Sequence, residues 1–304
     1  MEDKWRWAFV TAVAPIAWGS TYYVTRHTLP ADAALWGSAL RALPAGLLLL
    51  LLARRLPRGA WWWRSAVLGT LNVGAFFVLV YLAAQLLPTS VAASVMAAAP
   101  VTMMLLAWAM VGERPTARLV AGATTGIAGV LLVVTTSVDG LDLRGVLASV
   151  AAMTMSSVGF VLSKRWADGT PVLTTTAWQL MAGGLALTVV AVAVEGAPPA
   201  VDARAVAGFA YISLVGTALA FVCWFAGLAR LSAGAVGIVG LLNPVTGVLL
   251  GTVLAAESLS PTQVVGIALV LAGVVVGQQT GRAQRARAAS ASEHSRATSL
   301  TTRP

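Results

Sequence analysis

Residues 99–133 read APVTMMLLAWAMVGERPTARLVAGATTGIAGVLLV, and residues 243–277 read NPVTGVLLGTVLAAESLSPTQVVGIALVLAGVVVG. The two stretches align without a gap at a shift of 144 residues, and twelve residues are identical across positions 90–133. Apolar sequence gives chance matches among Val, Leu and Ala, but this shift also pairs residues that are rarer in apolar runs. These are Pro100 with Pro244, Glu113 with Glu257, and Gly122 with Gly266. The chain therefore contains an internal duplication.

The composition of the chain is that of a membrane protein. Apolar residues form 58% of the 304 residues and charged residues 10%, whereas soluble domains carry about 25% charged residues. The charges fall between apolar runs of about 20 residues, the length that spans the hydrocarbon core of a bilayer. Lipid offers no partners to backbone groups, so these runs must be helices. The net charge of +9 does not indicate nucleic-acid binding, because the basic residues do not form one patch with interleaved aromatics.

The apolar runs predict ten transmembrane helices. With the N-terminus inside, 16 lysines and arginines lie on the cytoplasmic side, against Arg26, Arg144 and Arg204 outside. This bias follows the positive-inside rule, so we expect both termini in the cytoplasm of a cell whose cytoplasmic membrane holds this multi-pass chain. The predicted helices cover residues 8–25, 33–53, 65–87, 90–112, 119–137, 145–163, 172–194, 205–229, 235–256 and 261–279.

The duplication divides the predicted helices into two sets of five. We expect a first five-helix repeat over residues 1–137 and a second over residues 138–280. Because five is an odd number, equivalent helices cross the membrane in opposite directions, and such inverted repeats are an architecture of secondary transporters. Residues 281–304 are rich in Arg, Ala, Ser and Thr, and we expect them to form a disordered basic cytoplasmic tail.

Short motifs in both halves are similar to those of one known family. They are Trp18-Gly19-Ser20-Thr21, Arg41, Pro100…Gly112-Glu113-Arg114-Pro115-Thr116 and Pro244…Ala256-Glu257-Ser258. Over about residues 8–280 the chain resembles EamA-type transporters of the drug/metabolite transporter superfamily. The resemblance implies a 5+5 inverted repeat around a central cavity, and movement, often export, of amino acids or other small metabolites. Ser258-Leu259-Ser260-Pro261 departs from the Glu-Arg-Pro-Thr form of the first half, so the two helix ends are not expected to do identical work.

Arg41 is the charged residue that lies well inside a predicted span. A charge near the bilayer midplane costs about 2.5–3.5 kcal/mol on insertion scales, so Arg41 needs a compensating partner. That partner is either a substrate carboxylate or phosphate, or neighbouring carbonyls and polar side chains. Binding pockets combine apolar and aromatic walls with a few polar groups, and packing against lipid or other helices is the alternative for each aromatic residue. The expected substrate-binding residues are Trp18, Tyr22, Arg41, Asn72, Tyr81, Trp108, Trp178, Gln179, Tyr211, Trp224 and Asn243.

The paired prolines and glutamates have expected roles as well. Pro100 and Pro244 lie near the middle of their predicted spans, where a proline removes a backbone hydrogen bond and kinks the helix. We expect them to act as hinges beside the cavity, with a tolerated kink as the alternative. Glu113 and Glu257 lie at helix ends, where they either bond a neighbouring helix or loop or form a gating ion pair. The Trp61-Trp62-Trp63 run beside Arg64 favours an aromatic belt at the membrane interface.

The sequence favours a transporter over an enzyme, and we expect no cofactor and no metal. One cysteine and two histidines are too few for a soft-metal site, and no cluster of nucleophilic or acid–base residues is visible. No Asp or Glu lies near the middle of a predicted span, so we expect facilitated diffusion or exchange, or coupling through some group other than a buried carboxylate. The preferred hypothesis is a secondary transporter that exports a small organic metabolite, such as an amino acid or xenobiotic. A flippase for a lipid-linked polyprenyl substrate is the alternative. The expected partners are that small molecule and the lipid bilayer, and the oligomeric state is left open.

Overall fold

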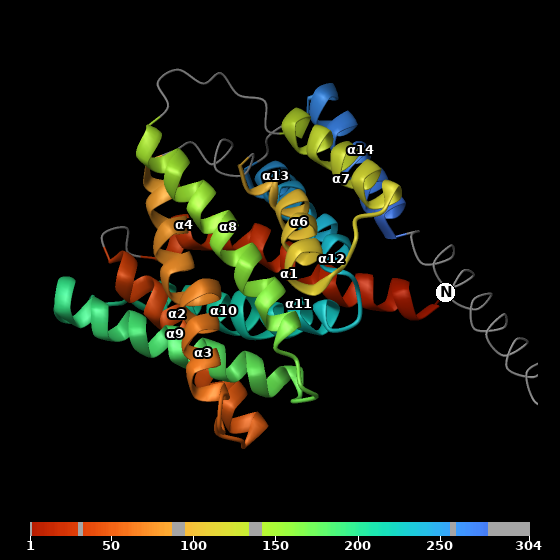
Figure 1. Ribbon diagram of the computed structural model, residues 1–304. Coiled ribbons are helices and arrows are strands. Elements are labelled where there is room, and N and C mark those ends of the chain that lie inside the picture. The colour runs from red at the N-terminus through yellow and green to blue at the C-terminus, as the bar shows by residue number, and fades with distance from the viewer. Residues whose placement is uncertain (1, 30–32, 87–94, 134–141, 256–259, 279–304) are drawn as a thin grey trace, which may run out of the picture.

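The protein folds as a bundle of apolar helices (Figure 1). A computed structural model describes residues 2–29, 33–86, 95–133, 142–255 and 260–278, and every regular element within these ranges is a helix. Six helical runs there are long and apolar enough to cross a membrane: Ala34–Ala53, Trp61–Ala83, Leu143–Arg165, Val172–Val194, Ala203–Leu228 and Pro261–Gln278. Shorter apolar helices cover Ala99–Val111, Ala117–Leu132 and Ala233–Gly247. The prediction of an all-α integral membrane protein is confirmed.

The helices follow the predicted runs closely. Val172–Val194 has the predicted bounds, whereas the first helix begins at Glu2 rather than at residue 8. Long basic side chains such as Lys4 can extend toward water, so a helix continues beyond the hydrocarbon core. The elements are α1 (Glu2–Thr28), α2 (Ala34–Ala53), α3 (Trp61–Gly69), η1 (Thr70–Gly74), α4 (Ala75–Leu86), α6 (Ala99–Val111), α7 (Ala117–Val133), α8 (Leu143–Arg165), α9 (Val172–Val194), α10 (Ala203–Ser213), η2 (Leu214–Leu219), α11 (Ala220–Leu228), α12 (Ala233–Gly240), α13 (Leu242–Ala255) and α14 (Pro261–Gln278).

Two long runs contain a π-helical stretch that the sequence did not predict. η1 joins α3 to α4, and η2 joins α10 to α11. The shift of 144 residues maps residues 70–74 onto residues 214–218, so both halves carry the π-helix at the same place. In a π-helix the backbone hydrogen bonds run from i to i+5, and such stretches occur frequently at functional sites. The duplication therefore extends from sequence motifs to an irregular backbone feature.

The two prolines of the duplicated motif begin helices and do not kink them. The predicted spans are not continuous helices at these points, because a turn at residues 97–98 precedes α6 and Leu241 separates α12 from α13. Pro100 is the second residue of α6, and Pro244 is the third residue of α13. A proline lacks the backbone N–H that the first turn of a helix leaves unpaired, so it is tolerated there. Each proline thus marks a break between two helical pieces.

Equivalent helices of the two halves pack against each other, and α7 with α14 shows this most clearly (Figure 1). A Cβ on Gly122 would lie 2.7 Å from the carbonyl oxygen of Gly273, and one on Gly129 would lie 2.6 Å from that of Gly266. The 144-residue shift makes Gly122 equivalent to Gly266 and Gly129 equivalent to Gly273. The two contacts therefore exchange under a two-fold axis, as in an isologous interface. Their order also makes the two helices antiparallel.

α2 and α9 form a second pair of this kind. A Cβ on Gly46 would lie 2.8 Å from the backbone nitrogen of Met181, and one on Gly184 would lie 3.0 Å from the Cα of Leu43. These contacts exchange when α9 is related to α2 by a shift of 138 residues. Small residues allow such close approach of helix backbones in a membrane protein. The pairing brings α2 of the first half against its equivalent α9 of the second half.

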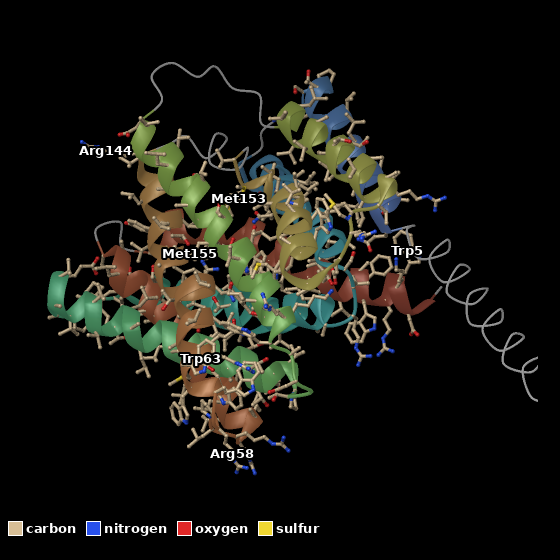
Figure 2. The ribbon with its side chains drawn as sticks, in the orientation of Figure 1. Trp5, Arg58, Trp63, Arg144, Met153 and Met155 are labelled. Carbon is tan, nitrogen blue, oxygen red and sulfur yellow. The ribbon has the colours of Figure 1, made fainter. Side chains whose placement is uncertain are left out.

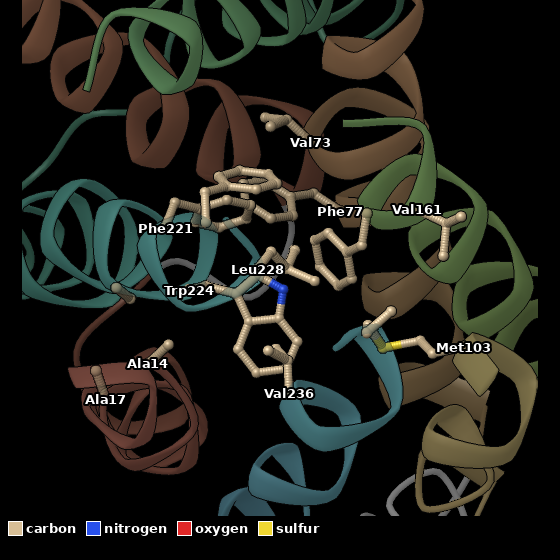
Figure 3. Close-up of a cluster of buried hydrophobic side chains, with 14 of the residues drawn as sticks. Ala14, Ala17, Val73, Phe77, Met103, Val161, Phe221, Trp224, Leu228 and Val236 are labelled. Carbon is tan, nitrogen blue, oxygen red and sulfur yellow. The ribbon is translucent and has the colours of Figure 1, made fainter. Parts of the chain in front are cut away.

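A core of buried apolar side chains lies where α1, α4, α8, α11 and α12 meet (Figure 3). Ala14 of α1 is fully buried, and Phe221 and Trp224 of α11 are 2% and 3% exposed. The small side chain on α1 leaves room for the large rings on α11, so the helices approach closely. The candidate site adjoins this core.

Candidate functional site

Arg41 lies in the middle of α2 and reaches across to η2 of the other half. Its Nε donates a hydrogen bond of 2.9 Å to the Thr217 hydroxyl, and its Nη2 donates one of 3.3 Å to the Gly216 carbonyl. The guanidinium carbon lies 4.2 Å from the centroid of the Phe77 ring, within cation–π range. The charge thus contacts a carbonyl, a hydroxyl and an aromatic ring. Neighbouring carbonyls and polar side chains were one of the two kinds of partner that the sequence analysis considered.

The π-helical stretch η2 presents the groups that hold Arg41. The Gly216 carbonyl also accepts a hydrogen bond of 3.1 Å from Nε1 of Trp18 on α1. The Thr217 hydroxyl donates a bond of 2.8 Å to the carbonyl of Ile212, five residues earlier. Both Gly216 and Thr217 are buried. One irregular turn of the second half is therefore tied to α1 and α2 of the first half.

An aromatic cluster continues from Trp18 into the core. The ring of Trp18 lies 5.1 Å from that of Trp224 and 5.5 Å from that of Phe221, measured between centroids. Figure 3 shows Trp224 beside Phe221 and Phe77. The indole Nε1 of Trp224 is buried and has no acceptor among the described residues. Buried indole N–H groups normally have a partner, so Trp224 offers a donor that a bound molecule can use.

A hydroxyl pair lies one turn before η2. The Ser20 hydroxyl lies 2.6 Å from the hydroxyl of Tyr211 on α10, and Ser20 also donates to the Ala17 carbonyl at 2.8 Å. Tyr211 is 36% exposed. The pair therefore joins α1 to α10 at a more exposed position beside Trp18 and Arg41, which both bond the Gly216 carbonyl.

Asn72 and Gln179 form a second polar contact between the halves. Nδ2 of Asn72 in η1 donates a 2.8 Å bond to Oε1 of Gln179 on α9, and both side chains are buried. The shift of 138 residues makes Gln179 the equivalent of Arg41, and the shift of 144 makes Asn72 the equivalent of Gly216. Each half therefore holds the π-helix of the other from the same helical position. The Asn72 Oδ1 has no partner among the described residues.

Two predicted site residues lie away from this region. Trp178 is buried near the start of α9, where its Nε1 donates a 2.7 Å bond to the Arg55 carbonyl and its ring packs 5.4 Å from that of Trp61. Trp108 is 54% exposed on α6, a position suited to contact with lipid. Neither belongs to the cluster around Arg41.

The remaining predicted site residues are less well defined by their contacts. Tyr81 is half-buried on α4, one turn after Phe77. Asn243 is half-buried at the start of α13, and a Cβ on Gly19 would lie 2.7 Å from its carbonyl oxygen. The side chain of Tyr22 and all of Glu257 lie outside the described residues.

Glu113 connects the two halves near one end of the bundle. It forms an ion pair with Lys164 at the end of α8. Its Oε2 also accepts a 2.9 Å bond from the backbone nitrogen of Ala233 at the start of α12, and Lys164 donates a 2.6 Å bond to the Leu231 carbonyl. The sequence analysis left the partner of a gating ion pair unnamed, and the fold supplies Lys164 of the second half, since α6 packs on α8.

Sequence reasoning missed Gly216, Thr217, Phe77 and Lys164. Thr217, Phe77 and Lys164 meet their partners through the packing of helices that are distant in the sequence, which no local motif signals. Gly216 alone had a signal, because the 144-residue shift pairs it with the predicted site residue Asn72. Within the described ranges, no group of three His, Cys, Asp or Glu side chains is placed to hold a metal ion.

Comparison with known proteins identifies a family. The sequence model of the EamA-like transporter family matches residues 5–135 and again residues 143–276. A solved crystal structure superposes with a TM-score of 0.78 over 92% of this chain and 98% of that chain. Its sequence identity of 22% makes this a likeness of fold.

Three curated relatives share most of their length with the chain. Protein PecM of Dickeya dadantii is 36% identical over 267 residues, which are 87% of this chain and 90% of that protein. A Salmonella typhimurium protein named "Probable amino-acid metabolite efflux pump" is 26% identical, over 68% of this chain and 73% of its own. A Streptantibioticus cattleyicolor protein named "Probable terminal-alkyne amino-acid exporter" is 26% identical, over 89% of this chain and 92% of its own.

Proposed function

The chain belongs to the EamA-like transporter family, and from this premise we propose that it is a secondary transporter that exports a small organic metabolite across the cytoplasmic membrane. The observation that carries the proposal is the bonding of Arg41, in the middle of a membrane helix, to a π-helix of the opposite half. A charged group inside a membrane helix is a functional-site hypothesis by default. The proposed site comprises Arg41, Trp18 and Trp224.

The proposed topology has ten membrane helices in two inverted repeats, residues 1–137 and 138–280. It is supported by the antiparallel packing of α7 on α14, which the duplication makes equivalent. Lys4 Nζ donates a 3.4 Å hydrogen bond to the carbonyl of Gln278, so the start of α1 and the end of α14 lie at the same end of the bundle. This arrangement supports an even number of crossings, and from the distribution of basic residues we propose that both termini lie in the cytoplasm. The basic tail, residues 281–304, lies outside the described residues.

Substrate binding can be coupled to movement of the halves through Arg41. A substrate carboxylate makes a charge-assisted, bidentate contact with a guanidinium, which is stronger than a bond to a neutral carbonyl. Such a substrate would replace Gly216 and Thr217 as the hydrogen-bond partner of Arg41, and η2 would then no longer be bonded to α2. A ligand shifts a conformational equilibrium only through differential interaction with the two states. Here the two states differ in the partner of Arg41, which is η2 in one state and the substrate carboxylate in the other.

The symmetry of the fold suggests how the site alternates between the two sides. Broken helices at the midplane and inverted repeats are features of transporters with alternating access. Pro100 and Pro244 begin the second piece of two such helices, and we propose these breaks as hinges. Glu113 with Lys164 would close the cytoplasmic end in this conformation. The described acidic residues lie in loops or at helix ends, which supports facilitated diffusion or exchange over proton coupling.

The substrate class is proposed from the site and the relatives together. Arg41 suits an anionic group, and the indole N–H of Trp224, which has no acceptor in the described part of the chain, suits an acceptor on the same molecule. Two of the relatives are named for amino acids or their metabolites. These observations favour an amino acid, or a xenobiotic of similar size, over the lipid-linked polyprenyl substrate of a flippase.

A thermal-shift screen of the purified full-length protein tests this proposal. The panel contains amino acids, sugars, nucleosides, organic cations and polyprenyl-linked precursors, because a specific ligand stabilises the folded state by mass action. We expect a carboxylate-bearing metabolite to raise the melting temperature of the native protein and of Trp108→Phe, which alters an exposed ring. The shift should disappear in Arg41→Gln and shrink in Trp224→Phe. Stabilisation by polyprenyl-linked compounds alone would replace the exporter with the flippase.

A further inference from the structure

Arg64 lies among three tryptophan rings near one end of α3. Its guanidinium carbon is 5.7 Å from the ring centroid of Trp61 and 5.8 Å from those of Trp63 and Trp166. The rings of Trp63 and Trp166 meet edge to face with their centroids 5.0 Å apart, so α3 and the end of α8 share the cluster. The Nε of Arg64 is buried without an acceptor among the described residues. We call these four residues the Arg64 cluster.

Positive charge gathers beside the Arg64 cluster. Arg54, Arg55 and Arg58 are exposed on the loop between α2 and α3. Figure 2 shows Arg58 and Trp63 at the same end of the molecule. The described ion pair of the chain joins Lys164 to Glu113, so it neutralises none of these arginines.

The carboxylate of Asp168 lies close to the cluster but is already bonded. One oxygen accepts a 2.7 Å bond from Nε1 of Trp61, and the other accepts bonds from the backbone and hydroxyl of Thr170. One negative charge in fixed bonds cannot balance the several arginines at this end. The cluster therefore keeps an excess of positive charge.

The surface around the cluster is suited to the boundary between lipid and water. Trp62 is 62% exposed, Trp63 is 52% exposed, and Leu56 on the preceding loop is 64% exposed. Tryptophan rings concentrate at the level of lipid headgroups. Arginines that lie beside such rings are therefore at the depth of the phosphate groups.

We propose that the Arg64 cluster binds the phosphate headgroup of an anionic glycerophospholipid. A guanidinium matches the oxygens of a phosphate with planar, charge-assisted bonds. The exposed faces of Trp62 and Trp63 would cover the glycerol and the first methylenes of the acyl chains. Each basic residue near the membrane surface strengthens attraction to anionic lipid by about fivefold. The inference concerns a lipid-facing surface and does not depend on the transported substrate.

Lipid binding to the purified full-length protein tests the proposal. Native mass spectrometry measures the apparent affinity for phosphatidylglycerol and for phosphatidylcholine, in the native protein and in the variants Arg64→Gln, Arg64→Lys and Arg58→Gln. Arg144→Gln is the matched control, since Figure 2 places this arginine at the end of the molecule opposite Arg58. A parallel titration includes inorganic phosphate as a competitor.

We expect phosphatidylglycerol to bind the native protein more tightly than phosphatidylcholine. Arg64→Gln and Arg58→Gln should each weaken phosphatidylglycerol binding by about fivefold, whereas Arg64→Lys should keep part of it and Arg144→Gln all of it. Equal loss in Arg144→Gln, or no loss in Arg58→Gln and Arg64→Gln, would overturn the proposal. Displacement by millimolar inorganic phosphate would also overturn it, in favour of a site for free anions. If Arg64→Gln does not fold, Arg58→Gln and Arg64→Lys decide the outcome.

Discussion

Arg41 and Gln179 occupy equivalent positions on α2 and α9, and each side chain bonds a π-helical segment of the opposite half. The partners differ, because Arg41 bonds a backbone carbonyl and a hydroxyl in η2, whereas Gln179 bonds the amide of Asn72 in η1. One of the two contacts is thus charged and the other is neutral. A charge can be drawn to an anionic ligand, while a neutral amide pair keeps its partner. This difference makes the Arg41 contact the one that substrate is expected to open.

Replacement of Arg41 by glutamine gives α2 the residue type of its equivalent on α9. We expect Arg41→Gln to fold, because it removes the need to place a charge at midplane depth. It should lose ligand-induced stabilisation and transport in proteoliposomes, whereas Trp178→Phe, changed outside the site, should keep both. Retained ligand stabilisation in Arg41→Gln would exclude contact between Arg41 and the substrate.

Removal of either member of the Asn72–Gln179 pair should destabilise the fold. Each alanine variant leaves a buried polar group without its partner, at about 1–3 kcal/mol. The double variant should cost less than the sum of the two single variants, because their bond is lost only once. Equilibrium unfolding in mixed micelles measures all four proteins. Strictly additive effects would mean that this bond does not couple the two halves.

Gly122→Ala should weaken the packing of α7 on α14. The added Cβ would lie 2.7 Å from the Gly273 carbonyl oxygen, so the helices must separate, at about 1–3 kcal/mol. Gly37→Ala is the matched control on α2, since no atom lies within 4 Å of the added Cβ. It should leave stability unchanged or raise it by up to about 1 kcal/mol. Equal melting temperatures for the two variants would argue against the close glycine contact.

Substitutions of Glu113 should distinguish the contribution of its hydrogen bond to Ala233 from that of its ion pair with Lys164. Glu113→Gln keeps an oxygen that can accept from the Ala233 backbone but loses the charge that pairs with Lys164. Glu113→Ala loses both interactions, so its melting temperature should fall further than that of Glu113→Gln. Lys164→Met should resemble Glu113→Gln. If the ion pair gates the cytoplasmic end, these variants should also alter the transport rate, and an unchanged rate would restrict the pair to a structural role.

Asp168 gives a pH dependence with a defined sign. The hydrogen bond from the Thr170 hydroxyl, together with that from Trp61, holds the pKa of Asp168 below its ordinary value. The carboxylate therefore stabilises the fold above the unfolded-state pKa of about 4, and this contribution is lost as the pH falls through the lower folded-state pKa. The melting temperature of the native protein should exceed that of Asp168→Asn at pH 7. The gap should narrow as the pH is lowered below the unfolded-state pKa of about 4, and a gap that does not change with pH would contradict this assignment.

Much of the site could not be predicted from the sequence. Trp18 and Arg41 were expected site residues, and the fold brings them to the same Gly216 carbonyl. Trp178 satisfied the same criteria, an aromatic ring within an apolar run, but lies in a separate cluster with Trp61. Hydropathy and residue type report that a side chain is in the membrane. They do not report which face of the helix it occupies or which helix it meets.

By itself the sequence determined the membrane helices, the duplication and the family. The helices follow from the bilayer, because lipid requires apolar runs of fixed length with internally bonded backbones. The duplication and the family follow from residues and motifs that recur at fixed positions in both halves. Only the tertiary structure decided where the π-helices lie, that Pro100 and Pro244 start helices, and that Lys164 is the partner of Glu113. Each of these depends on contacts between helices far apart in the sequence. The two halves differ in residue type within the π-helices yet carry them at the equivalent place, which hydropathy alone does not indicate.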